Sequence, residues 1–161
     1  MSSFLNILDL DQGLAIVRIG LGLWWLKSVL HKPYPKFVQG QMVDWTLSLI
    51  ENHPIPGPFK PLAAMLEKGR SWFPYLVVAG EASVALGLIF GFLTPVSLIV
   101  AIFMNLNYIS LAGFRPKDIN VNKAYQCEQG QNWNMIVPEV VLLLTGAWTT
   151  WSVDAFLGWF V

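Results

Sequence analysis

Residues 73–113 read FPYLVVAGEASVALGLIFGFLTPVSLIVAIFMNLNYISLAG, and Glu81 is the one charged residue in this run. A helix needs about 20 mostly apolar residues to cross a bilayer core of about 30 Å. The run therefore has room for two such helices, over 73–93 and 95–113. Pro95 suits the first turn of the second helix, because its missing N–H costs nothing there. The stretch predicts a tight antiparallel hairpin of two transmembrane helices.

Two further windows, 12–30 and 133–151, have the same apolar character. The chain of 161 residues is 55% hydrophobic and 12% charged, whereas a soluble domain carries roughly 25% charged residues. Its mean hydropathy is +0.52. The sequence therefore predicts an all-α fold, an integral membrane four-helix bundle that forms a single domain over 1–161.

The long connection after the first window, 31–72, is divided by prolines into two amphipathic pieces. Apolar residues recur at three- and four-residue steps in both pieces: Val38, Met42, Trp45 and Leu49 in the first, and Leu62, Met65 and Leu66 in the second. Both pieces are too short to span a bilayer, but their spacing is helical. We expect short amphipathic helices that lie in the membrane interface or fold over the end of the bundle.

Basic residues outside the spans are confined to two long connections, 31–72 and 114–132. They are Lys32, Lys36, Lys60, Lys68, Arg70, Arg115, Lys117 and Lys123. Cytoplasmic loops of membrane proteins are enriched in Lys and Arg. The pattern predicts that the long loops lie in the cytoplasm and both termini outside. We expect the membrane to be the inner (cytoplasmic) membrane of a bacterium or archaeon.

Several kinds of redox and metal site are excluded or disfavoured. Cys127 is the only cysteine, which excludes an intrachain disulfide, a thiolate zinc site and a CxxC pair. His31 and His53 each lie beside a proline-rich turn and are interpreted as solvated. Ten basic and ten acidic residues cancel, so no net field favours nucleic acid. We expect no metal site and no cofactor bound by the chain's own motifs.

Four ionisable residues, Arg18, Lys27, Glu81 and Glu139, lie in or near the predicted spans. A charge at the centre of a transmembrane helix costs roughly 2.5–3.5 kcal/mol, so each of them requires an explanation. Counted along the helices, six polar residues lie at similar depth on the long-loop side: Lys27, Glu81, Glu139, Asn105, Asn107 and Tyr108. Arg18 lies alone toward the other side.

Two interpretations of this polar cluster remain open. In the catalytic interpretation, a pocket holds a quinone head group or a small anion. Its catalytic residues are Glu81, Glu139 and Lys27, and its binding residues are Asn105, Asn107, Tyr108 and Arg18. In the structural interpretation, Lys27 pairs with Glu81 or Glu139, and asparagine hydrogen bonds lock the helices together. Two carboxylates near one lysine leave one acid protonated or paired elsewhere.

Small residues recur at four-residue spacing in the second span, at Ala79, Ser83, Gly87 and Gly91. Such a stripe lets another helix approach closely. We interpret it as a helix-packing face, and Glu81 lies off it, toward a different neighbour.

Short motifs spread over nearly the whole chain resemble the DoxX/DoxD family. They are Arg18-Ile19-Gly20 with Lys27, Glu81 with Gly87 and Gly91 leading to Thr94-Pro95, Trp133-Asn134, and Trp151-Ser152-Val153-Asp154. The resemblance is strongest to the DoxD branch, the membrane subunit of thiosulfate:quinone oxidoreductase. It implies four membrane helices, a partner subunit, and electrons that pass from thiosulfate to a membrane quinone with tetrathionate as product.

The leading functional hypothesis is therefore a DoxX/DoxD-like subunit of a quinone-linked electron-transfer system, in contact with the lipid bilayer and with other membrane or peripheral subunits. Electrons must therefore travel through a redox centre of a partner subunit or pass directly to bound quinone. The alternative is a non-catalytic accessory subunit that packs a larger respiratory or photosynthetic complex. A transporter or channel for a small anion is the weakest hypothesis, since few polar residues lie within the spans.

Overall fold

The computed structural model describes residues 8–160, which form helices and turns and contain no strand. In chain order the elements are α1 (Leu10–Leu30), η1 (Phe37–Gln41), α2 (Met42–Glu51), η2 (Gly57–Phe59), α3 (Lys60–Lys68), α4 (Phe73–Phe90), α5 (Thr94–Ala112), α6 (Tyr125–Thr145) and α7 (Val153–Leu157). Three of them, α1, α4 and α5, are long and apolar enough to cross a membrane. The predicted all-α class is confirmed.

Local signals explain where the long helices begin and end. Asp9 caps α1, because its carboxylate accepts from the backbone N–H of Gln12 at 2.7 Å. Gly91 ends α4 with a left-handed φ of 63°, a conformation that costs glycine little. The predicted tight connection to α5 follows at once. In the last long helix, Gly146 adopts a φ of 72° and ends α6.

The predicted span 133–151 is placed differently from the helix that the structure contains. Helix α6 already begins at Tyr125, inside the connection expected to run to residue 132, and it ends at Thr145. Residues 146–152 form turns before the short helix α7. The shift arises because the polar residues after Tyr125 continue the helix, whereas Gly146 interrupts the apolar run.

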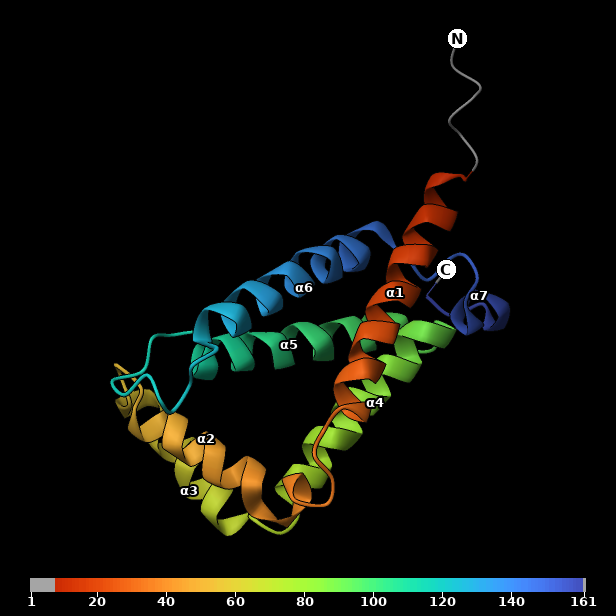
Figure 1. Cartoon of the computed structure of the whole chain (residues 1–161). Helices are drawn as coiled ribbons and strands as arrows, with labels where there is room; N and C mark the ends of the chain where they lie inside the picture. The colour runs from red at the N-terminus through yellow and green to blue at the C-terminus, as the bar shows by residue number, and fades with distance from the viewer. Residues whose placement is uncertain (1–7, 161) are drawn as a thin grey trace.

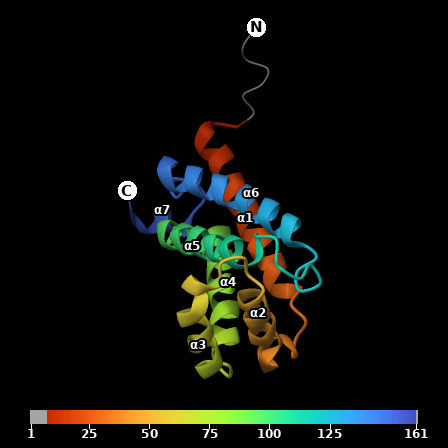
Figure 2. The same ribbon diagram turned by 90° about the vertical axis from the view of Figure 1, so that its left-hand side faces the viewer.

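The long helices form two antiparallel pairs, α1 with α4 and α5 with α6 (Figure 1). The pairs meet near α7 and diverge toward the other end, where α2 and α3 bridge the gap between them. A second view likewise places α2 and α3 at the end opposite the N-terminus (Figure 2). The arrangement is therefore more open than the predicted four-helix bundle, because the α2–α3 hairpin inserts between the diverging pairs.

The main core lies where the two pairs meet. Its buried members include Leu21, Trp25, Ala85, Leu88, Leu98 and Leu142. Close approach of α1 to α4 depends on Gly22, where an added Cβ would lie 2.8 Å from the backbone nitrogen of Ile89. A smaller core of Val43, Ile50 and Leu66 joins α2 to α3. The predicted interfacial helices therefore bury an apolar face inside the protein.

The predicted stripe of small residues on α4 packs along only half its length. Gly87 and Gly91 are buried, whereas Ala79 and Ser83 are exposed. A Cβ on Gly87 would overlap the hydroxyl group of Ser97 on α5. Within this chain the stripe therefore packs closely only at Gly87 and Gly91, and its first two members face outward.

Arg18 is fully buried at the closed end of the molecule and lies outside the cavity described below. Its guanidinium donates to four backbone carbonyl oxygens: Leu88 at 3.1 Å, Ala147 at 2.7 Å, Thr150 at 3.2 Å and Trp151 at 2.6 Å. These bonds tie α1 to the end of α4 and to the turns after α6. The expected binding role of Arg18 is therefore replaced by a structural one.

Candidate functional site

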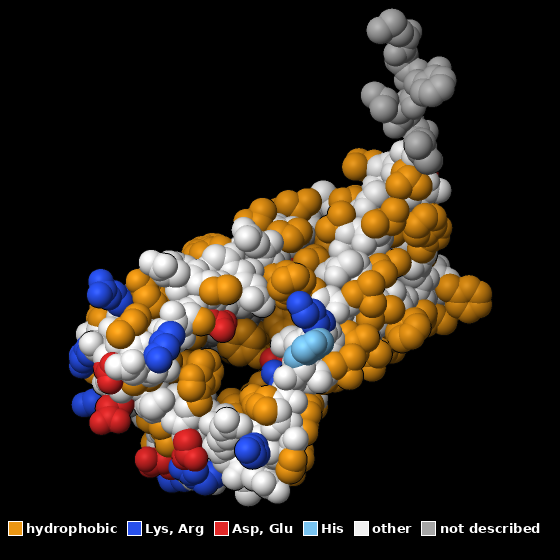
Figure 3. Space-filling model, in the orientation of Figure 1, with side chains coloured by type: hydrophobic (Ala, Val, Ile, Leu, Met, Phe, Trp, Pro, Cys, Tyr) orange, Lys and Arg blue, Asp and Glu red, His pale blue; other side chains and the backbone are white. Residues whose placement is uncertain are grey.

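A cavity of about 620 Å³ lies between the two diverging helix pairs and the α2–α3 hairpin. The space-filling view shows a hollow there, with both basic and acidic side chains on its rim (Figure 3). Its apolar wall includes Trp24, Phe37, Met42, Leu62, Leu66 and Met104. Most of its polar lining residues lie on α1, α4, α5, α6 and the loop after α1, opposite this apolar wall, which makes the cavity suitable for an amphipathic molecule.

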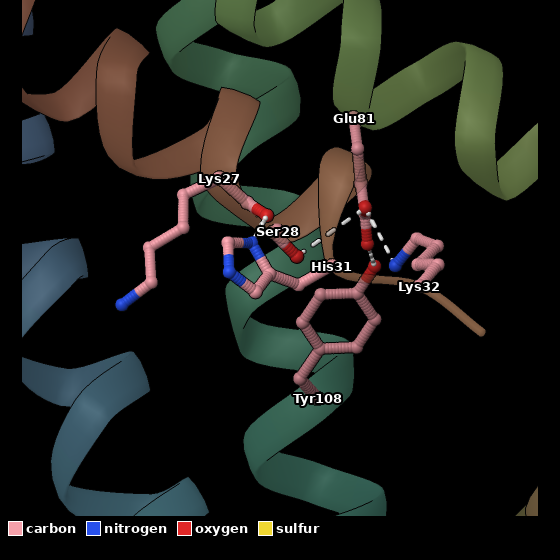
Figure 4. Close-up of polar contacts among 6 residues, drawn as sticks. All are labelled: Lys27, Ser28, His31, Lys32, Glu81 and Tyr108. Atoms are coloured by element: carbon pink, nitrogen blue, oxygen red, sulfur yellow. Dashed lines mark hydrogen bonds and ion pairs between the residues drawn. The ribbon is translucent and has the colours of Figure 1, made fainter.

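Glu81 lies on α4 at the wall of this cavity and is 2% exposed. One carboxylate oxygen, Oε2, lies 2.7 Å from the ammonium nitrogen of Lys32 and accepts from the Ser28 hydroxyl at 3.4 Å. The other, Oε1, accepts from the Tyr108 hydroxyl at 2.7 Å. Three elements and the loop after α1 thus converge on one carboxylate (Figure 4).

Lys27, expected to pair with Glu81 or Glu139, pairs with neither. Its side chain is exposed, and its ammonium lies 5.1 Å from the ring centroid of Trp24. Figure 4 shows it directed away from Glu81. Neighbouring helical positions point about 100° apart, so Ser28, which faces α4, turns Lys27 outward. Lys32 reaches back from the loop and replaces it as the partner of Glu81.

Glu139 is fully buried on α6. Its Oε1 accepts from Trp25 Nε1 at 3.0 Å and from Asn105 Nδ2 at 3.0 Å, and its Oε2 lies 2.9 Å from the same Asn105 nitrogen. Among residues 8–160, no Lys, Arg or His nitrogen lies within 4.0 Å of this carboxylate. The two acids therefore differ, because Glu81 has a cation and Glu139 has only neutral donors.

The two carboxylates are linked through side chains that line the cavity. Trp25 and Asn105 line it and separate it from Glu139. The ring of Trp25 lies 6.5 Å, centroid to centroid, from that of Tyr108, which donates to Glu81. The structure thus brings together Glu81, Glu139, Asn105 and Tyr108 as the depth argument predicted.

Asn107 also lines the cavity, but its amide nitrogen donates to the Phe103 carbonyl of its own helix at 2.7 Å.

Two residues outside the predicted apolar spans, which the sequence did not point to, complete the site. Lys32 lies just past the end of α1, and only the length of its side chain could have suggested that it reaches Glu81. Glu128 lines the cavity from the first turn of α6.

Tyr34 lies outside the spans, in the loop that carries Lys32, and the same carboxylate affects the pKa of its phenol. Desolvation, followed by the negative charge of Glu81, raises the pKa of its phenol.

His53, which the sequence analysis interprets as solvated, is instead buried, with 5% of its surface exposed. Its Nε2 lies 3.0 Å from the Ser110 carbonyl oxygen, so it joins the loop after α2 to the end of α5.

The chemistry available at the cavity is binding of a polar head group and exchange of protons. At its wall a carboxylate contacts both an ammonium and a phenol, Glu128 adds another carboxyl group, and Glu139 lies behind Trp25 and Asn105. Within the described part of the chain, no group of three or more His, Cys, Asp or Glu side chains could hold a metal ion. Cys127 is exposed in the first turn of α6.

Comparison of the chain with protein-family models, with curated proteins and with solved structures finds no match. No similarity to a known protein therefore assigns a role to the cavity or to its carboxylates.

Proposed function

We propose that this chain is a membrane subunit of a quinone-linked electron-transfer system and that its cavity receives the quinone head group. The observation that carries the proposal is an apolar cavity of about 620 Å³ whose wall holds a carboxylate. That cavity lies between helices apolar enough to cross a membrane. Exposed apolar side chains at its edge, such as Leu76 and Phe103, suit a lipid-like tail.

Reduction of a quinone takes up two electrons and two protons. The resemblance to the DoxX/DoxD family supplies a source for the electrons, since two thiosulfate ions joined as tetrathionate release two. They would reach the quinone through a partner subunit, because this chain carries no redox motif of its own. In this proposal a carboxylate close to the cavity relays the protons, either Glu81 at its wall or Glu139 behind Asn105.

The membrane arrangement belongs to the same proposal. Helix α6 is the fourth span, and the long connections lie in the cytoplasm of a bacterium or archaeon. Both connections occupy one end of the molecule, where the backbone N–H of Lys117 donates to the Asn52 carbonyl at 2.9 Å. The basic residues of both connections then face the cytoplasm, the side on which loops of membrane proteins are enriched in Lys and Arg.

Quinone binding by the purified chain tests the proposal. In lipid nanodiscs, a decyl-substituted benzoquinone should quench tryptophan fluorescence saturably, because Trp24, Trp25 and Trp45 line the cavity. Gly80→Leu should abolish the saturable part, since Gly80 lines the cavity and an added Cβ would already lie 3.5 Å from the sulfur of Met104.

Gly20→Leu is the matched control, because no heavy atom lies within 4 Å of a Cβ built there. It should bind quinone like the unmodified chain. Binding that survives Gly80→Leu in a folded protein, or the absence of saturable binding to the unmodified chain, would overturn the proposal.

A second candidate, a non-catalytic subunit of a larger complex, is favoured by one observation. Every carboxylate oxygen of Glu81 and Glu139 accepts a bond from within the chain, as expected of groups that only lock helices together. Extraction in mild detergent separates the two candidates. Co-purification with a complex whose activity is unchanged by Glu81→Gln would favour the accessory role.

A further inference from the structure

The cavity lies between two helix pairs that come together along two edges. Helix α1 contacts α6, and α4 contacts α5, but the pairs diverge toward the α2–α3 hairpin (Figure 1). The divergence leaves one gap between α1 and α6 and another between α4 and α5. The cavity reaches the surface at those of its lining residues that are exposed: Trp24, Trp45, Met65, Leu76, Phe103 and Gln131.

The gap between α4 and α5 is mostly apolar. Before Glu81, none of the lining residues of α4 carries a polar side chain: they are Phe73, Leu76, Val77 and Gly80. Helix α5 adds four apolar lining residues, Val100, Phe103, Met104 and Leu111, and its polar ones nearby are Asn107 and Tyr108. Leu76 and Phe103 are 55% and 65% exposed. The apolar lining therefore continues onto the outer surface of the helix pair.

Met104 marks the level at which this gap begins. A Cβ built on Gly80 would lie 3.5 Å from the sulfur of Met104, so α4 and α5 still approach each other closely there. Leu76 lies about one turn farther from the α4–α5 connection, and it is about 7.5 Å from Glu81 along the helix axis. A flexible chain attached to a head group beside Glu81 can therefore reach Leu76 and leave the cavity there.

The gap between α1 and α6 is bordered by charged groups. Its exposed lining residues are Trp24 and Gln131, and Glu128 lies one turn before Gln131 on α6. The ammonium of Lys27 lies 5.1 Å from the ring centroid of Trp24. Over the described range 8–160, no Lys, Arg or His nitrogen lies within 4.0 Å of the Glu128 carboxylate. A hydrocarbon chain in this gap would remove charged groups from water without pairing them, which is unfavourable.

We infer that the apolar tail of the ligand leaves the cavity between α4 and α5, past Leu76 and Phe103, an inference that rests on the proposed function. The head group then lies beside Glu81, and the α1–α6 gap stays open to water and polar reactants. The ligand exchanges directly with the bilayer through the α4–α5 gap. A head group with a long apolar tail binds more tightly than the head group alone, because each buried methylene group adds to the affinity.

Photolabelling tests the route of the tail. A benzoquinone that carries a diazirine part-way along its decyl tail is bound to the chain in nanodiscs and irradiated, and the labelled residues are located by peptide mass spectrometry. Labels that an excess of unmodified decyl-benzoquinone suppresses should fall within 73–80 and 100–107. Suppressible labels within 24–28 or 128–135 would overturn the inference, whereas the absence of saturable binding to the unmodified chain would end the proposed function as well.

A serine substitution removes part of the apolar gap. Leu76→Ser should raise the dissociation constant of decyl-benzoquinone about fourfold, the effect of about one methylene group that is no longer buried. Leu86→Ser is the matched control, because Leu86 is 50% exposed on the same helix but does not line the cavity. Leu86→Ser should bind the probe like the unmodified chain, and so should Gln131→Ala on the α1–α6 side.

The binding constants of these variants separate the inference from the proposed function. Equal affinities of Leu76→Ser and Leu86→Ser, or a larger loss in Gln131→Ala than in Leu76→Ser, would contradict the tail route. Saturable binding by the unmodified chain would leave the proposed function standing in either case.

Discussion

The ammonium of Lys32 lies 2.7 Å from the carboxylate of Glu81 and joins the loop after α1 to the middle of α4. Their side chains are 12% and 2% exposed, so both charges are largely removed from water. The pair also lines the cavity beside Phe37 of η1, whose ring centroid lies 4.8 Å from the Lys32 ammonium. Its loss would therefore affect both stability and the shape of the site.

Breaking this pair from one side should be costly. Lys32→Met leaves Glu81 without its cation, and removal of one partner from a buried pair typically costs about 3–5 kcal/mol. We expect a loss near the lower limit, because Lys32 is partly solvated, and Glu81→Gln added to Lys32→Met should recover much of it. Denaturant unfolding in detergent micelles provides the measurement.

Lys27→Met is the control for this experiment, since Lys27 is exposed and contacts the Trp24 ring. It should change the free energy of unfolding by less than about 0.5 kcal/mol. A loss in Lys27→Met as large as that in Lys32→Met would show that Lys27 is the true partner of Glu81.

The two buried acids should respond differently to neutralisation. Glu139→Gln keeps an oxygen that can still accept from Trp25, and a flip of the Asn105 amide would let its oxygen accept from the new amide nitrogen. No charge is left unpaired, so the protein should lose little stability. Glu81→Gln strands the ammonium of Lys32 and should lower the unfolding midpoint clearly more. The same unfolding assay measures both variants, and equal losses would contradict the distinction between a cation-paired and a neutrally bonded carboxylate.

Leucine substitutions along the small-residue stripe should separate its two halves. Gly87→Leu would overlap Ser97. Gly91→Leu would place its Cβ 2.8 Å from the Cα of Ser152 and would have to adopt a left-handed φ of 63°. Both should prevent a stable fold and sharply reduce the yield of monodisperse protein in size-exclusion chromatography. Ala79→Leu and Ser83→Leu should be tolerated, because both positions are exposed. Comparable losses in all four would restore the continuous packing face.

The sequence contains enough information to predict three helices of the fold and most of the polar cluster. Hydropathy locates α1, α4 and α5, since a span needs a long apolar run. Depth along these helices then brings Glu81, Glu139 and Asn105 to one level. Depth does not specify in which direction a side chain points around the helix axis. The sequence therefore predicts that Lys27 reaches a buried acid, whereas in the structure Ser28 faces Glu81.

Features that depend on long-range contacts could not be predicted from the sequence. Asp154 stands in a terminal motif without any sign of burial, yet it is fully buried and accepts from the backbone N–H groups of Leu93 and Thr94, each at 2.7 Å. Arg18 looked like an isolated charge because its partners are carbonyl oxygens, which every residue has. The divergence of the two helix pairs likewise depends on how the α2–α3 hairpin packs.

Arg18 should be among the most sensitive positions for stability. Arg18→Met removes the donor from four carbonyl oxygens, and an unsatisfied buried acceptor costs about 1–3 kcal/mol. We expect most of the chain to be lost to aggregation or degradation. Arg18→Lys keeps a charge but lacks the planar fork, so it should retain an intermediate yield of folded protein. A fully stable Arg18→Met variant would contradict the structural role.

Labelling of single cysteines tests the proposed orientation in the membrane. Cys127 is exposed at the long-loop end and is the only cysteine of the chain. In intact cells, a membrane-impermeant maleimide should therefore fail to label Cys127 until the membrane is permeabilised. In a Cys127→Ser background, Val153→Cys on α7 should be labelled without permeabilisation, because α7 packs against the α4–α5 turn at the opposite end of the molecule, where Asp154 accepts from Leu93 and Thr94. The reverse pattern would invert the orientation, and labelling of both cysteines from outside would require α6 not to span the membrane.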